Sequence, residues 1–375
     1  MADQMCKKAF DSGGRKGLGL AERDYIHESL IIAGLCHDLG HGPFSHTFDS
    51  LVIPRITGSR EWSHEQASEM LFDDMIDTYH IDMEAHQIKF IKGLIRGERT
   101  CNYDIDWIYE VISSKKYGLD VDRFDYMMRD PLHTGQVDLV FRPSIYLDNF
   151  SIIENEMVYN GKICNKIFEF FNHRYKLFKN IYLNRKGIGF EYMVADLFSM
   201  VATDFNFAEA IYDPKKYLKL TNNIMDDIDR IGDTRKDVRQ MVNRFYHRQN
   251  YKFVNELIFI KKTKKRHSEE ELKKLKDLFL SLQRTEHSTS KLTDENTILS
   301  ASLTKYCEEN QFDTIKVMDF DGQIKLASSF TNLMNVVDPY EYQVHLYVKD
   351  PAVYDLAKET WTTLVQGYSH LLKIE

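Results

Sequence analysis

The chain has 375 residues, 43% of them hydrophobic and 13% aromatic, and its 57 acidic residues outnumber 49 basic ones to give a net charge of −8. This length predicts a folded protein of two or three domains, and the acidic balance argues against a dedicated binder of duplex DNA. Five dispersed cysteines with no CxxC pair argue against a disulfide framework or a zinc–thiolate site. The sequence has neither a membrane-spanning apolar run nor a signal-peptide pattern, so we expect an intracellular protein, in the nucleus or the cytoplasm.

The first ten residues carry apolar side chains at i, i+4 and i+8 with no N-cap before them. The chain therefore reads as beginning inside a helix, although a fortuitous short helix explains the pattern equally well. Residues 20–36 predict a helix that is apolar on all sides and therefore buried. A short hairpin is expected at 150–163. Further helical patterns cover 64–80, 83–96, 103–115, 120–130, 165–186 and 188–210.

The second half of the chain changes character twice. Helices are expected across 234–262, and the charged run that begins at 261 predicts a charged helix followed by a mobile linker up to 297. Within it, KKTKKR resembles a basic nuclear-import signal, but a solvated helix face explains it as well. Three alternating runs then predict strands, at 313–321, 323–330 and 342–350, and Pro351 suits the first turn of a closing helix.

These patterns predict a mainly α fold. An all-helical core is expected over 1–258, a charged helix and linker over 259–298, and a smaller α+β lobe over 299–375.

The stretch LCHDLGHGPFSHTFD, residues 35–49, concentrates histidine and aspartate. His37 and Asp38 are adjacent at the end of an apolar helix, so both reach one ion only beyond that end. Imidazole and carboxylate suit iron, manganese or zinc, with magnesium a further candidate. A lone HD pair is more often a capped helix end with a core histidine. His41 and His46 shift this balance, because histidines can bind phosphate oxygens and protonate a leaving oxygen.

Two further stretches supply matching groups. WSHEQAS adds His64 and Glu65, and Asp49 follows His46 by three residues, where it can hold that ring. In GLDVDRFDYMMRD, the spacing places Asp122, Tyr126 and Asp130 on one helix face. Arg123 follows Asp122 directly in the sequence. These groups suit a metal-bound phosphate ester, and the alternative is an acidic solvent face. The run FNHRYKLFKNIYLNRKG interleaves cations and rings, as suits a nucleotide, although a snorkelling amphipathic helix is the ordinary alternative.

Together, LCHDLGHGPFSH, WSHEQAS, GLDVDRFDYMMRD and YLKLTNNI resemble the HD-domain deoxynucleoside triphosphate triphosphohydrolases. The resemblance runs from about residue 1 to 375 and is loosest in the C-terminal lobe. It implies an HD-type core over 1–258 and hydrolysis of a dNTP, such as dGTP, to deoxynucleoside and triphosphate by metal-activated water. It also implies activation by GTP or a dNTP and a homo-oligomer, either dimer or tetramer. Single-stranded nucleic acid is a further candidate partner, and no membrane is expected.

The resemblance also implies a role for each matching residue. The metal ligands would be His37, Asp38 and Asp122. The catalytic group would comprise His46 as general acid with His41, His64, Asp49 and Glu65. The triphosphate would contact Arg123, Tyr126 and Arg174, while Asp130 would read the 3′-hydroxyl and Tyr182 would exclude a 2′-hydroxyl. An activating nucleotide would contact Arg185, Arg248 and Lys252. Without the resemblance, the i, i+4 spacing of Arg248 and Lys252 would indicate an exposed helix surface.

The sequence departs from the family pattern at its start. The family's first metal-ligand histidine precedes the HD pair by about forty residues, and here only His27 precedes His37, about 15 Å away along the same helix. The SAM domain and the first part of the HD domain are also expected to be absent. Three interpretations stay open: an active triphosphohydrolase, a truncated isoform or paralogue of little activity that assembles with full-length subunits, and another HD nucleotide phosphohydrolase. Tyr182 and the arginine pair argue against the last.

Overall fold

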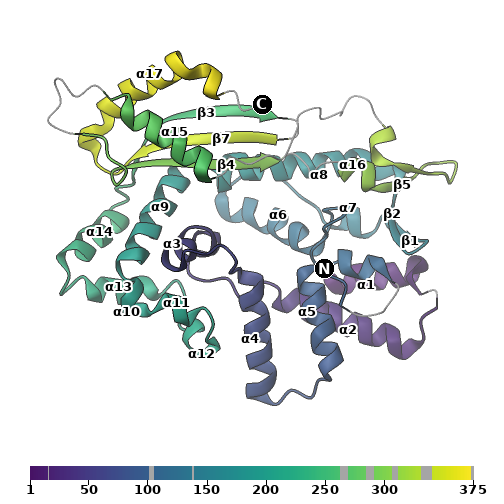
Figure 1. Cartoon of the computed structure of the whole chain (residues 1–375). Helices are drawn as coiled ribbons and strands as arrows, with labels where there is room; N and C mark the ends of the chain where they lie inside the picture. Colours follow the sequence, from purple (N-terminus) through teal and green to yellow (C-terminus); the bar gives the residue numbers. More distant parts are fainter. Residues whose placement is uncertain are drawn as a thin grey trace. The chain divides into compact units, whose positions relative to one another are not determined.

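The computed structural model describes residues 1–15, 17–100, 105–136, 139–261, 269–283, 291–305, 311–330 and 340–372. Helices dominate these residues and the strands form two small sheets (Figure 1), which confirms the mainly α fold with an α+β part. No helix among them is long and apolar enough to cross a bilayer.

Contacts divide the chain into two units, each built from three segments. Unit 1 comprises Met1–Leu177, Phe205–Ile224 and Asn310–Asn335. Unit 2 comprises Phe178–Asp204, Met225–Glu309 and Val336–Glu375. The predicted domains are continuous segments of the chain, with boundaries after residues 258 and 298. Each of the two units, in contrast, joins segments that are distant in the sequence.

Unit 1 is built mainly of helices. Its first helix, α1 (Ala2–Ala9), shows that the first residues are helical, which both readings of the N-terminal pattern expected, and it packs on α2 (Leu20–Cys36), where His27 Nε2 lies 2.7 Å from Asp3 Oδ1. The other helices of this unit are α3 (Ile53–Thr57), α4 (His64–Tyr79), α5 (Ala85–Arg96), α6 (Val121–Thr134), α7 (Ser144–Leu147), α8 (Cys164–Leu177), α11 (Phe207–Ala210), α12 (Pro214–Tyr217) and α16 (Gln311–Thr314).

Two predicted helices are wrong in this part of the chain. In the described part of this range, 105–115, the structure has only a 3₁₀ turn, Asp106–Glu110, because the carbonyls of Val111 and Ile112 accept hydrogen bonds from Val121 and Asp122 rather than from a following helical turn. The single helix expected at 188–210 is three: α9 (Arg185–Met200), α10 (Ala202–Phe205) and α11. The last break falls at Asn206, whose φ of 47° is left-handed.

The sheet of unit 1 joins distant strands. The predicted hairpin is confirmed as β1 (Phe150–Ile153) and β2 (Glu156–Asn160). β2 then pairs in parallel with β5 (Lys316–Met318), and β5 pairs antiparallel with β6 (Ile324–Leu326). Two of the three strands predicted near the C-terminus therefore belong to the unit that contains the HD stretch.

Unit 2 centres on a three-stranded antiparallel sheet in the order β3-β7-β4. The central strand, β7 (Tyr340–Val348), confirms a prediction, and β3 (Lys252–Lys261) corrects one, because 252–261 was expected to be helical. β4 (Thr297–Lys305) was not predicted. The helices of this unit, besides α9, include α13 (Ile224–Ile231), which begins at the unit boundary, α14 (Lys236–Tyr246), α15 (Glu269–Ser281) and α17 (Tyr354–Leu372).

The helices α15 and α17 lie beside this sheet (Figure 1). In one core cluster of unit 2, Val344, Leu346 and Val348 pack against Phe279 of α15 and Trp361 of α17. The expected charged helix is confirmed by α15, and Pro351 begins a 3₁₀ turn, capped by the preceding aspartate, that leads into α17 as predicted. Residues 262–266 of KKTKKR and 284–290 of the expected linker lie outside the described residues.

Candidate metal and phosphate site

The HD pair lies where the buried helix α2 ends. His37 Nδ1 donates to the carbonyl of Gly34 at 3.0 Å, so Nε2 is the ring nitrogen that can bind a metal ion when it gives up its proton. This buried Nε2 has no hydrogen-bond partner among the described residues, and it lies 3.4 Å from Asp38 Oδ2 and 3.5 Å from Asp122 Oδ1. An imidazole nitrogen and two carboxylates from the predicted ligand set therefore converge on one point.

Asp122 reaches this point because of how α6 begins. Asp120, whose side chain is fully buried, caps the helix by accepting from the backbone N–H of Arg123 at 2.8 Å and from that of Ser114 at 2.7 Å. Asp122 then lies in the first turn. The buried cap thus fixes the start of α6 opposite the end of α2.

The three ligand candidates fit a divalent cation. Burial alone would lower the pKa of His37, but the carboxylate of Asp122 close to its Nε2 and the charge of Asp38 raise it to about 9. The arrangement therefore favours a positive charge at this point, and a metal ion bound by His37, Asp38 and Asp122 would supply it in place of the proton.

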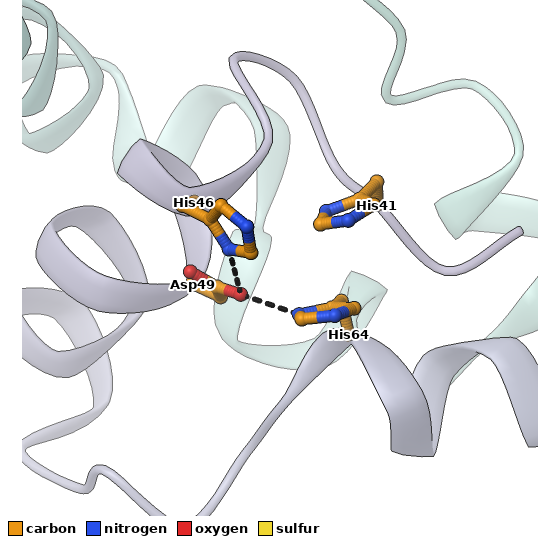
Figure 2. A group of neighbouring side chains, drawn as sticks. All are labelled: His41, His46, Asp49 and His64. Carbon is orange, nitrogen blue, oxygen red and sulfur yellow. Dashed lines mark hydrogen bonds and ion pairs between the residues drawn. The ribbon is translucent and has the colours of Figure 1, made fainter. Parts of the chain in front are cut away.

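A second group comprises His41, His46, Asp49 and His64 (Figure 2). His64 Nδ1 is 2.7 Å from Asp49 Oδ2, and His46 Nδ1 is 3.5 Å from the same oxygen. The ring of His41 stacks on that of His64 with centroids 4.0 Å apart. One carboxylate thus orients two imidazoles, and a third imidazole lies against them.

Charge couples these groups. Burial raises the pKa of Asp49, but hydrogen bonds and positive charge from His46 and His64 lower it to about 2, so this carboxylate stays ionised. Asp49 in turn raises the pKa of His46, whose side chain is 74% exposed. His41 Nε2 lies 3.5 Å from Asp38 Oδ1 and so connects the two groups.

Ser68 is a site residue that sequence reasoning did not assign. Its Oγ donates to the carbonyl of His37 at 2.7 Å and accepts from the N–H of Gly40 at 2.8 Å. Gly40 packs so tightly on α4 that a Cβ would lie 2.1 Å from the carbonyl oxygen of His64. The WSHEQAS stretch contained this serine, but nothing in its spacing indicated what it binds.

The other predicted site residues of unit 1 lie on α4, α6 and α8. Glu65 Oε1 is 3.6 Å from His64 Nε2. The guanidinium of Arg123 pairs with the buried Asp120 and donates to the carbonyl of Ser114 at 3.2 Å. Burial raises the pKa of Tyr126, and the nearby charges of Arg174 and Arg123 oppose that rise. Asp130 lies two turns beyond Asp122 on α6. Their contacts with substrate stay predictions.

The remaining predicted residues lie in unit 2. Tyr182 contacts the ring of Phe178 edge-to-face at 5.0 Å. Arg185 begins α9 and lies over the ring of Phe253, and Lys252 begins β3 and lies over the ring of Tyr354. Arg248 is exposed in a left-handed turn with φ of 53°. Because α14 ends at Tyr246, Arg248 and Lys252 do not form a helix surface, so that alternative reading is wrong.

Comparison with known proteins supports the resemblance carried by the motifs. The chain is 31% identical over 243 residues to the deoxynucleoside triphosphate triphosphohydrolase SAMHD1 homolog of Dictyostelium discoideum, covering 64% of this chain and 46% of that protein. It is 32% identical over 274 residues to human deoxynucleoside triphosphate triphosphohydrolase SAMHD1, covering 64% and 43%. An HD domain-containing protein of Acanthamoeba polyphaga mimivirus is 33% identical over 201 residues, covering 53% and 43%.

These matches confirm that the chain resembles HD-domain deoxynucleoside triphosphate triphosphohydrolases. The chain spans less than half the length of the three relatives. No family model matches it.

Proposed function

We propose that this chain is a metal-dependent dNTP triphosphohydrolase, which cleaves a dNTP into deoxynucleoside and triphosphate. The observation that carries the proposal is the pairing of two groups within unit 1: a ligand set of His37, Asp38 and Asp122, and beside it a histidine cluster built around Asp49. The similarity to named triphosphohydrolases supports the choice of substrate.

The two groups divide the work. A divalent cation held by His37, Asp38 and Asp122 would polarise a phosphate oxygen and acidify a water molecule. His46 is exposed enough to meet the substrate, and Asp49 raises its pKa and so favours the protonated form that can give a proton to the departing 5′-oxygen. His64, fixed by Asp49, and His41, stacked on it, can donate hydrogen bonds to phosphate oxygens.

Further parts of the proposal concern binding. Tyr126 of α6 and Arg174 of α8 lie close enough to interact electrostatically, which suits a triphosphate, and Asp130 shares one side of α6 with Asp122 and Tyr126. Activation by GTP or a dNTP, and assembly into a dimer or tetramer, would use the exposed cations Arg185, Arg248 and Lys252.

The assay is direct. Purified protein is incubated with each dNTP and Mn²⁺, with and without GTP, and we expect deoxynucleoside and triphosphate as products. The His46→Ala variant should lose this activity, whereas His133→Ala, which removes an exposed histidine of α6, should keep it. Absence of product from every dNTP would reject the proposal, and a monophosphate product would indicate another nucleotide phosphohydrolase.

The pH dependence should report the Asp49–His46 pair. Asp49 raises the pKa of His46, and an acid catalyst must be protonated, so activity should fall as the pH rises through that raised pKa. Asp49→Asn removes the negative charge, lowers the pKa of His46 and should move the fall to lower pH. The measurement is kcat from about pH 6 to 9, the range in which a histidine of raised pKa titrates. An alkaline limb unchanged in the variant would contradict the assignment of His46.

A further inference from the structure

The YLKLTNNI stretch, residues 217–224, resembles the family but has no role in the site described above. It belongs to the segment Phe205–Ile224 of unit 1, and two of its side chains contact the loop that follows the HD pair. The Tyr217 hydroxyl donates to the carbonyl of Gly40 at 2.6 Å, and Asn222 Oδ1 accepts from the backbone N–H of Phe44 at 2.9 Å.

The loop 40–46 needs such contacts because its backbone is unfavourable. Phe44 and Ser45 have φ of 63° and 49°, a left-handed conformation that costs a residue with a side chain about 1 kcal/mol or more. Such conformations persist when the surroundings over-determine them. The hydrogen bond to Asn222 fixes the strained turn immediately before His46.

The other contact is rigid because Tyr217 is itself fixed. Its side chain is 3% exposed, and its ring packs with those of Trp62 at 6.0 Å and Phe48 at 6.5 Å. Phe48 is fully buried, and it lies between His46 and Asp49 in the sequence. The N–H of Gly40 already binds Ser68, so Tyr217 completes the hydrogen bonding of the residue just before His41.

We infer that Tyr217 and Asn222 are positioning residues, which hold the two ends of loop 40–46 so that His41 and His46 keep their places beside the metal ligands. Tyr217 fixes the end that carries His41, and Asn222 fixes the end that carries His46. Neither residue reaches a reacting atom. The consequence for catalysis rests on the proposed function, whereas the ordering of the loop does not.

The first test is independent of activity. Hydrogen exchange at the Phe44 amide should be at least about tenfold faster in Asn222→Ala than in the unaltered chain, because the amide loses its acceptor. The matched control is Asn223→Ala, since the neighbouring asparagine side chain has no hydrogen bond to any described residue. Equal exchange in both variants would overturn the inference even if the enzyme is active.

The second test measures turnover. Asn222→Ala and Tyr217→Phe should each lower kcat about tenfold at an unchanged bound-metal content, because a misplaced acid loses rate without losing the metal. Asn222→Asp, which keeps an acceptor oxygen, should retain most of the activity. The controls are Asn223→Ala and Tyr212→Phe, which alters a tyrosine that is exposed in the same segment.

The outcomes are separable. Equal losses in Asn222→Ala and Asn222→Asp, or a loss of bound metal in Tyr217→Phe, would overturn the positioning role. If the unaltered chain hydrolyses no dNTP, the proposed function fails, and the exchange at Phe44 still decides whether Asn222 orders the loop.

Discussion

Asp122→Asn should empty the metal site and lower kcat by about a hundredfold or more, since losing even a partner of a metal ligand typically costs 10–100-fold. The substitution keeps the shape of the side chain but removes one of the two negative charges that face His37 Nε2. Bound metal is counted by elemental analysis of the purified protein, and kcat is measured in the same samples.

The control for this experiment lies on the same helix. Asp125→Asn removes a carboxylate from α6 that pairs with Arg129 at 2.9 Å and is not part of the ligand set. This variant should keep both metal and turnover. If Asp122→Asn bound as much metal as Asp125→Asn, the assignment of Asp122 as a ligand would be wrong.

Gly40→Ala should destabilise unit 1 by about 2 to 3 kcal/mol and reduce metal binding, because a well-packed interior accommodates an extra methyl only by moving. The new Cβ would lie 2.1 Å from the carbonyl oxygen of His64 and 2.2 Å from the amide nitrogen of Ser68, so two backbones would have to separate. Such a shift also breaks the Ser68 bridge to His37.

The measurement is urea-induced unfolding, with metal content determined alongside. Gly187→Ala is the matched control: a Cβ there meets no atom within 4 Å, and alanine is the better helix former at that position in α9. An unfolding midpoint in Gly40→Ala equal to that of Gly187→Ala would show that the HD turn and α4 are not packed as described.

The sequence predicted those parts of the fold that local pattern determines. The helix that ends at Cys36 and the one that begins at His64 follow from apolar periodicity, and they lie where expected. The strand β3 was missed because Lys252–Lys261 mixes polar and apolar residues without strict alternation, around a bulge between Phe253 and Asn255. Its partner is β7, about ninety residues later, and no local signal announces that pairing.

The same division holds for the site. Residue types and spacing indicated His37 and Asp38, because metal chemistry restricts the choice of ligand, and the family resemblance added Asp122. Ser68 and Asp120 were not found, since a serine and a capping aspartate are common in many settings and their partners are set by packing. Sequence patterns thus identified side chains whose chemistry suits a metal or a phosphate. Only the fold identified the residues that hold those side chains in place.

The discontinuity of unit 1 has a consequence for how the protein is made. Its helices up to Leu177 leave the ribosome long before Tyr217, Asn222 and the strands β5 and β6, which belong to the same unit. The parallel partner of strand β2 is synthesised about 155 residues after it, so a long loop must close before the two strands can pair. A nascent chain that stops after α8 therefore carries the metal ligands but lacks Tyr217 and Asn222, whose contacts order loop 40–46. Binding of the metal ion and ordering of this loop are therefore separate events in time.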